Sequence, residues 1–200
     1  MLREISFMGL RLVIDDWVYE PSDDTDILAA VALSITPTHS RVLEIGCGCG
    51  AISILLALRG CSVVATDISK HALSIARKNA RLHNVSIDFR LGDLFDPVSD
   101  EKFDTIIFNP PYLPSDPMDF IIPEEFRRCV VGGTRGNEII LRFLAGLRSH
   151  LNKGGFGLFV MSSLSRPSEI YQYISTLGMS YNVMAERSFF FERLYVVRVA

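Results

Sequence analysis

The stretch RVLEIGCGCGAISILLALRG, residues 41–60, decides the fold of this chain. Its first five residues form an apolar run, which predicts a buried strand, and alternating glycines then stop that strand. The residues behind the glycines repeat apolar side chains at helical spacing until Gly60, which predicts a helix that ends there. A strand, a glycine turn and a helix in this order are typical of the first unit of a parallel α/β sheet.

Strands and helices continue to alternate on the carboxyl side of this unit. The sequence predicts strands at 62–66, 86–90, 103–109 and 156–161, helices at 68–84, 137–155 and 167–177, and an antiparallel hairpin over 181–200. This alternation indicates a mostly parallel sheet with helices on both faces. The longest irregular stretch is 113–137, and long irregular loops in compact domains are often functional.

Composition limits the classes of protein to consider. The chain has 200 residues, 48% of them hydrophobic, which suits one well-packed domain. Its net charge of −3 argues against a protein whose main task is to grip nucleic acid, because phosphate binding needs a basic excess. No apolar run is long enough for a membrane span, and the start has no signal-peptide core. The chain has four cysteines, and their spacing is not that of a zinc site, so we expect reduced thiols and no bound metal. Reduced thiols are typical of a cytoplasmic protein. The cysteines are Cys47, Cys49, Cys61 and Cys129.

Glycines and carboxylates follow neighbouring predicted strands at one edge of the sheet. Gly46, Gly48 and Gly50 would let the backbone approach a ligand closely, although a tight strand-to-helix turn needs glycine in any protein. Asp67 ends the second strand, where it could accept both ribose hydroxyls of an adenosine-containing cofactor, and Asp93 could accept from an adenine amino group. A helix cap at Asp67 and a turn at Asp93 are the structural alternatives. Together these residues favour a cofactor crevice.

The sequence NPPY, residues 109–112, follows the fourth strand at the same edge. An amide or aromatic amine nitrogen is a poor nucleophile because its lone pair is delocalised. The side-chain oxygen of Asn109 and the carbonyl of Pro110 could accept its two N–H groups, with Pro111 stiffening the segment and Tyr112 lying against the flat group. An Asn-Pro turn after a strand is the alternative interpretation. In this crevice the pattern favours methyl transfer to a planar nitrogen.

EIGCGCG, TDIS, GDLF and NPPY, in this order and at these intervals, resemble the class I S-adenosylmethionine-dependent methyltransferases that methylate amino groups. Two further stretches, VYEPSDDTDIL at 18–28 and GGTRGNEIILRFL at 132–144, are similar to the HemK-type glutamine methyltransferases of class I translation release factors. Within that family the resemblance is to the short archaeal and eukaryotic branch. It covers almost the whole chain.

The resemblance implies a Rossmann-like seven-stranded sheet, with residues 1–25 as a short extension packing on the core and 26–200 as the methyltransferase domain. It implies that Asn109, Pro110, Pro111 and Tyr112 hold the glutamine side chain. Glu44 departs from the commoner Asp of related methyltransferases, but either carboxylate can orient the glycine loop. The residues that it implies for S-adenosylmethionine binding are Thr25, Glu44, Gly46, Cys47, Gly48, Gly50, Asp67, Ile68, Asp93, Leu94 and Asn109.

The resemblance also implies partners, namely a release factor as substrate and a small zinc-binding activator subunit. Three alternatives stay open from the residues. An adenine or cytosine aminomethyltransferase acting on DNA or RNA would use the same NPPY chemistry, and Arg127, Arg128 and Arg135 could meet phosphates. A protein lysine methyltransferase is the second alternative. A non-catalytic cofactor-binding module is the third, although binding alone does not require the NPPY set.

Overall fold

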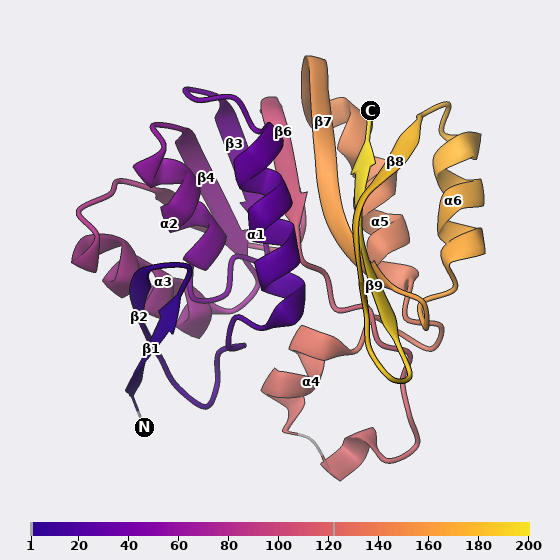
Figure 1. Cartoon of the computed structure of the whole chain (residues 1–200), viewed down its shortest axis with the longest axis horizontal. Helices are drawn as coiled ribbons and strands as arrows, with labels where there is room; N and C mark the ends of the chain where they lie inside the picture. The colour runs from indigo at the N-terminus through magenta and orange to yellow at the C-terminus, as the bar shows by residue number, and fades with distance from the viewer. Residues whose placement is uncertain (1, 122) are drawn as a thin grey trace.

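One seven-stranded sheet organises the computed structural model, which describes residues 2–121 and 123–200. Its strand order is β5-β4-β3-β6-β7-β9-β8 (Figure 1). Neighbours among β3–β7 pair in parallel, whereas β9 is antiparallel to both β7 and β8. The mostly parallel sheet with a C-terminal antiparallel hairpin is therefore confirmed. The strands are β3 (Arg41–Ile45), β4 (Ser62–Asp67), β5 (Asp88–Leu91), β6 (Phe103–Phe108), β7 (Leu151–Ser162), β8 (Tyr181–Ser188) and β9 (Arg193–Val199).

Helices cover both faces of the sheet because its central strands are apolar on both sides. Neighbouring residues such as Val42 and Leu43 enter two different buried clusters. One cluster packs beneath α1, α2 and α3, and the other beneath α5 and α6 (Figure 1). None of the helices described by the structure is long and apolar enough to cross a bilayer. The helices are α1 (Asp23–Ile35), α2 (Ala51–Leu58), α3 (Lys70–Leu82), α4 (Glu124–Val130), α5 (Glu138–Leu147) and α6 (Pro167–Thr176).

The N-terminal residues form a separate two-stranded hairpin, β1 (Arg3–Phe7) and β2 (Leu10–Ile14). The buried side chain of Asn79 on α3 joins this hairpin to the rest of the chain. Its Oδ1 accepts from the backbone N–H of Val13 at 2.8 Å, and its Nδ2 donates to the carbonyls of Val13 at 2.9 Å and Cys49 at 3.0 Å. One side chain thus connects the hairpin, helix α3 and the glycine turn.

Three segments differ from the sequence prediction. The helix predicted at 137–155 ends at Leu147, because Leu151 already pairs with Phe103 at the start of β7. The stretch 113–137, predicted to be irregular, contains the short helix α4 and a 3-10 turn at Asp119–Ile121. Helix α1 was not predicted. His150 is buried and stacks on Phe95 with 4.3 Å between ring centroids.

Candidate functional site

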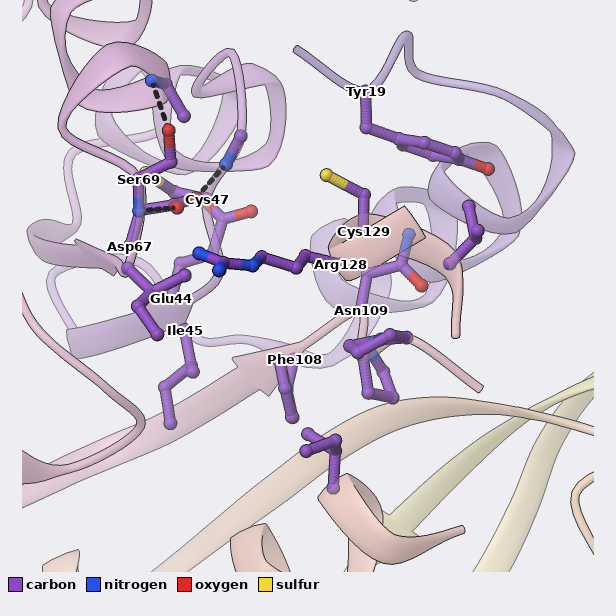
Figure 2. A pocket seen from close by; sticks show the side chains of 18 of the residues that line it. Tyr19, Glu44, Ile45, Cys47, Asp67, Ser69, Phe108, Asn109, Arg128 and Cys129 are labelled. Atoms are coloured by element: carbon purple, nitrogen blue, oxygen red, sulfur yellow. Dashed lines mark hydrogen bonds between the residues drawn. The ribbon is translucent and has the colours of Figure 1, made fainter. Parts of the chain in front are cut away.

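A cavity of about 570 Å³ lies at the carboxyl ends of β3, β4 and β6, a size typical of small-molecule sites. Figure 2 shows Glu44 and Asp67 on one side of it and Asn109 on the other, with Arg128 extending between them. Every residue predicted for the site except Gly50 lines this cavity. Those that it brings together are Thr25, Glu44, Gly46, Cys47, Gly48, Asp67, Ile68, Asp93, Leu94, Asn109, Pro110, Pro111 and Tyr112.

The glycine turn between β3 and α2 needs glycine for two different reasons. All three glycines have left-handed backbone angles, with φ of +63° at Gly46, +54° at Gly48 and +84° at Gly50. A Cβ on Gly48 would meet nothing within 4 Å, whereas one on Gly50 would lie 3.1 Å from the Cβ of Ala76 on α3. The missing side chain of Gly48 therefore leaves space in the cavity, and that of Gly50 lets α2 and α3 pack closely.

The carboxylate of Asp67 is buried at the end of β4 and faces the glycine turn. Its Oδ2 accepts from the backbone N–H of Gly48 at 2.9 Å, and its Oδ1 accepts from that of Ser69 at 2.8 Å. The helix cap considered for Asp67 belongs to Ser69, whose hydroxyl accepts from the backbone N–H of Ala72. Since a carboxylate oxygen has two lone pairs, each oxygen of Asp67 keeps one for a ligand hydroxyl. Burial raises the pKa of Asp67.

Glu44 is a deeply buried carboxyl group of the site. It lies in β3, accepts a short hydrogen bond from the hydroxyl of Ser53 on α2, and lines the cavity. Burial raises its pKa from 4.5 to about 8, which the bond from Ser53 only partly offsets. A cationic ligand group beside Glu44 would favour its ionised form, so this position fits an ammonium group.

The third predicted strand end is more open than the first two. Asp93 forms an ion pair with Arg142 of α5 at 2.7 Å, a contact that the sequence did not indicate. Leu94 has a φ of +44°, an uncommon conformation for a residue with a side chain. Ile68 is 62% exposed while lining the cavity. An apolar side chain exposed within a cavity is suited to pack against a flat ligand group.

Asn109 follows β6 directly, and the two groups of its side-chain amide differ sharply. Its Nδ2 donates to the hydroxyl of Thr25 at 3.4 Å. Its Oδ1 is buried and has no hydrogen-bond partner among the described residues. A buried acceptor without a hydrogen-bond donor destabilises the folded state, so this oxygen is suited to accept a hydrogen bond from a ligand N–H group.

Asp24, in the first turn of α1, is a site residue that sequence reasoning missed. Asp24 is only 3% exposed. It accepts from the hydroxyls of Tyr112 at 3.1 Å, Tyr19 at 3.0 Å and Thr25 at 3.0 Å. The run SDDTD at 22–26 signals a capped helix start, but nothing in it distinguishes Asp24 from its acidic neighbours.

The chain that follows NPPY lines the cavity, and two glycines allow its backbone to pack closely against NPPY. The backbone N–H of Leu113 donates to the carbonyl of Val130 at the end of α4. A Cβ on Gly132 would lie 2.4 Å from the carbonyl oxygen of Pro111, and one on Gly136 would lie 2.5 Å from that of Tyr112. The stretch GGTRG at 132–136 is therefore the backbone support of NPPY.

Thiols line the cavity as well. Burial raises the pKa of Cys47 in the glycine turn and of Cys129 on α4, so both are neutral at pH 7. Within the described residues, no group of three or more histidine, cysteine or acidic side chains could hold a metal ion.

Comparison with known proteins places these features in a family context. The family model described as the methyltransferase small domain matches residues 21–128. A protein of Methanocaldococcus jannaschii named as a protein N5-glutamine methyltransferase is 38% identical over 194 residues, covering 96% of each chain. The release factor glutamine methyltransferase of Geobacter sulfurreducens is 34% identical over 178 residues, which are 86% of this chain and 62% of that protein. The chain thus spans less than two thirds of the bacterial relative.

Among solved structures, the fold is similar to that of the E. cuniculi Mtq2–Trm112 complex, described as responsible for methylation of the eRF1 translation termination factor. The TM-score is 0.72 at 24% identity, covering 92% of this chain and 98% of the other. At that identity the similarity establishes the fold.

Proposed function

Because this chain belongs to the HemK-like family of S-adenosylmethionine-dependent N5-glutamine methyltransferases, we propose that it is a cytoplasmic enzyme that methylates a glutamine side chain of a class I release factor. The observation that carries the proposal is the buried Oδ1 of Asn109, which lacks a partner among the described residues. A primary amide offers an N–H group to such an acceptor. The glutamine side chain would lie between Asn109 and the ring of Tyr112.

The cavity has the groups that the cofactor requires. Asp67 keeps two lone pairs for ribose hydroxyls, Glu44 suits the ammonium group of the methionine part, and the missing Cβ of Gly48 leaves room beside them. Bound S-adenosylmethionine supplies an electrophilic methyl group. These residues bind and orient the cofactor, whereas the NPPY segment acts on the methyl acceptor.

The role of the NPPY segment is to orient the acceptor nitrogen. Asn109 Oδ1 and the carbonyl of Pro110 accept its two N–H groups, which directs the nitrogen lone pair out of the amide plane. The Tyr112 hydroxyl is held by Asp24, so its ring is fixed beside the acceptor. Positioning of this kind and preorganised dipoles supply the rate enhancement. No residue needs to remove a proton before the N–C bond forms, because the nitrogen becomes strongly acidic once it bonds the methyl and then loses one proton.

The surface around the cavity favours a protein acceptor over a nucleic acid. Arg128 and Arg142 each form an ion pair with a carboxylate of this chain, and Arg135 shares Glu169 with Arg166, so part of their charge is already balanced. The turn between β8 and β9 instead exposes two aromatic side chains, Phe190 at 93% and Phe191 at 84%. Exposed apolar groups of this size are typical of protein-docking surfaces.

This turn lies near the NPPY segment. The pKa of Tyr112 is raised mainly by burial. The charge of Glu192, which belongs to the β8–β9 turn, is close enough to raise this pKa further. The release factor would thus contact the β8–β9 turn while its glutamine enters the cavity. A small activator subunit would cover another apolar part of this chain, and the Mtq2–Trm112 complex is an example of a similar fold paired with a second chain.

The test is methyl transfer from labelled S-adenosylmethionine to purified acceptors. A class I release factor, the same factor with its target glutamine replaced, and duplex DNA are compared, each with and without an activator subunit. Label in the intact release factor alone is the expected result. Label in DNA, or in the factor without its glutamine, would refute the substrate assignment.

The role of Asn109 is tested in the same assay. Asn109→Ala should lower kcat about 100-fold or more, since an oriented contact to the reacting group is lost, while cofactor affinity changes little. Asn152→Ala is the matched control, because Asn152 bonds to Asp104 and is absent from the cavity lining. Unchanged turnover of Asn109→Ala would refute the mechanism.

A further inference from the structure

The side chain of Asn109 could face either way, since its amide oxygen and nitrogen are nearly equal in size. Only one of the two orientations presents the oxygen to the cavity. The group that selects it must therefore be a hydrogen-bond acceptor on the other side of the amide. In this structure that group is the hydroxyl of Thr25, 3.4 Å from Asn109 Nδ2.

A hydroxyl has one hydrogen, so once it donates that hydrogen to one partner it can only accept hydrogen bonds from its other neighbours. The hydroxyl of Thr25 donates to Oδ1 of Asp24 at 3.0 Å, and a carboxylate only accepts. Toward every other neighbour the Thr25 oxygen is therefore an acceptor. It accepts from the backbone N–H of Ser22 and from Asn109 Nδ2, both at 3.4 Å.

We propose that Asp24 is the positioning residue of this site: through the hydroxyl of Thr25 it fixes Asn109 with its oxygen toward the cavity, and directly it fixes the ring of Tyr112. The inference rests on the proposed function and deepens it. Asp24 Oδ1 serves the asparagine branch and Oδ2 the tyrosine branch, so one carboxylate orients both ends of the NPPY segment.

The burial and contacts of Asp24 support this role. The backbone N–H of Thr25 and the hydroxyl of Ser22 also donate to its Oδ1, and the hydroxyl of Tyr19 donates to its Oδ2. The neighbouring Asp23 instead forms an ion pair at 2.7 Å with Arg187 of β8 and has a side chain that is 59% exposed. The two adjacent aspartates thus face different surroundings.

The first experiment separates the hydroxyl from the shape of residue 25. Thr25→Val keeps the shape and removes the hydroxyl, so kcat should fall about tenfold or more, because a misplaced reacting contact is costly. The resemblance implies cofactor binding for Thr25, but its hydroxyl hydrogen is donated to Asp24, so cofactor affinity should change less than about threefold. Thr25→Ser restores the hydroxyl and should restore most of kcat. Wild-type kcat in Thr25→Val, or lost cofactor affinity with unchanged kcat, would overturn the proposal.

The second experiment measures the coupling between Thr25 and Asn109. If Thr25 acts through Asn109, adding Thr25→Val to Asn109→Ala should lower kcat no further. Additive losses would show two independent roles and overturn the inference. If Asn109→Ala alone keeps full activity, the proposed function fails instead, so the two failures are distinguishable.

Asp24 itself is tested with its neighbour as control. Asp24→Ala should lower kcat at least as much as Thr25→Val, because both branches lose their acceptor, while Asp23→Ala should leave kcat unchanged. Thermal unfolding of each variant shows whether a loss of kcat comes from a loss of folded protein. If Asp24→Ala does not fold, the comparison of Thr25→Val with Thr25→Ser tests the proposal. Equal kcat in folded Asp24→Ala and Asp23→Ala would overturn the proposal.

Discussion

The buried carboxyl group of Glu44 makes the stability of this protein depend on pH in a defined direction. Its pKa is raised from 4.5 to about 8 by burial. Because the folded pKa lies above the unfolded one, the contribution of Glu44 to stability is complete below pH 4.5 and is lost as pH rises through 8. Glu44→Gln cannot ionise, so the variant lacks this loss.

The size of the effect follows from the two pKa values. Between pH 5 and pH 9 the ionisation of Glu44 should lower the free energy of unfolding of the wild type by about 4 kcal/mol, at about 1.4 kcal/mol per pKa unit. Glu44→Gln should therefore gain about that amount relative to wild type over this range. The gain is a difference between two proteins, so titrating groups that do not interact with Glu44 cancel, whereas the neighbouring Asp67 does not.

Urea unfolding of the ligand-free protein at pH 5, 7 and 9, followed by circular dichroism, measures this difference. Glu101→Gln is the control, because its bonds to Arg90 and Arg41 lower the pKa of Glu101. The stability that Glu101 contributes is lost only at acid pH. The free energy of unfolding of Glu101→Gln relative to wild type should therefore stay constant between pH 5 and 9. A Glu44→Gln difference that also stays constant would refute the raised pKa of Glu44.

Further substitutions test the cavity, its support and the docking surface. Asp67→Ala should weaken cofactor binding about tenfold or more, because charge-assisted bonds to the ribose are lost; calorimetric titration with unchanged affinity would contradict the ribose contact. Gly136→Ala should destabilise the fold more than Gly154→Ala, because both have φ near +80° but only Gly136 lies against the Tyr112 carbonyl; equal losses in thermal unfolding would rule out the backbone clamp. Phe190→Ser should raise the KM for the release factor several-fold while the exposed control Leu58→Ser does not; a KM unchanged by Phe190→Ser would exclude the β8–β9 turn as a docking surface.

The sequence by itself determined the sheet and the order of its strands along the chain, because the signals are local. Apolar runs ended by Gly46, Asp67 and Asn109 mark strand ends, and parallel strands bring their carboxyl ends to one edge. Those signals also predicted that Asp67, Asp93 and the NPPY segment would line the cavity, whereas Thr25, Glu44 and Leu94 came from the family resemblance. They failed at α4 and at the end of α5, where pairing and packing with distant segments override local pattern.

Only the tertiary structure decided how the cavity is held in shape. The contact between Asp24 and Tyr112 spans 88 residues of chain, and that between Thr25 and Asn109 spans 84. No local pattern distinguishes Asp24 from Asp23, because the difference is which way each side chain faces once α1 packs on the sheet. The clamp of Gly132 and Gly136 is likewise a contact between backbones. Composition and periodicity carry no information on such contacts, since they arise only when separate segments meet in the folded chain.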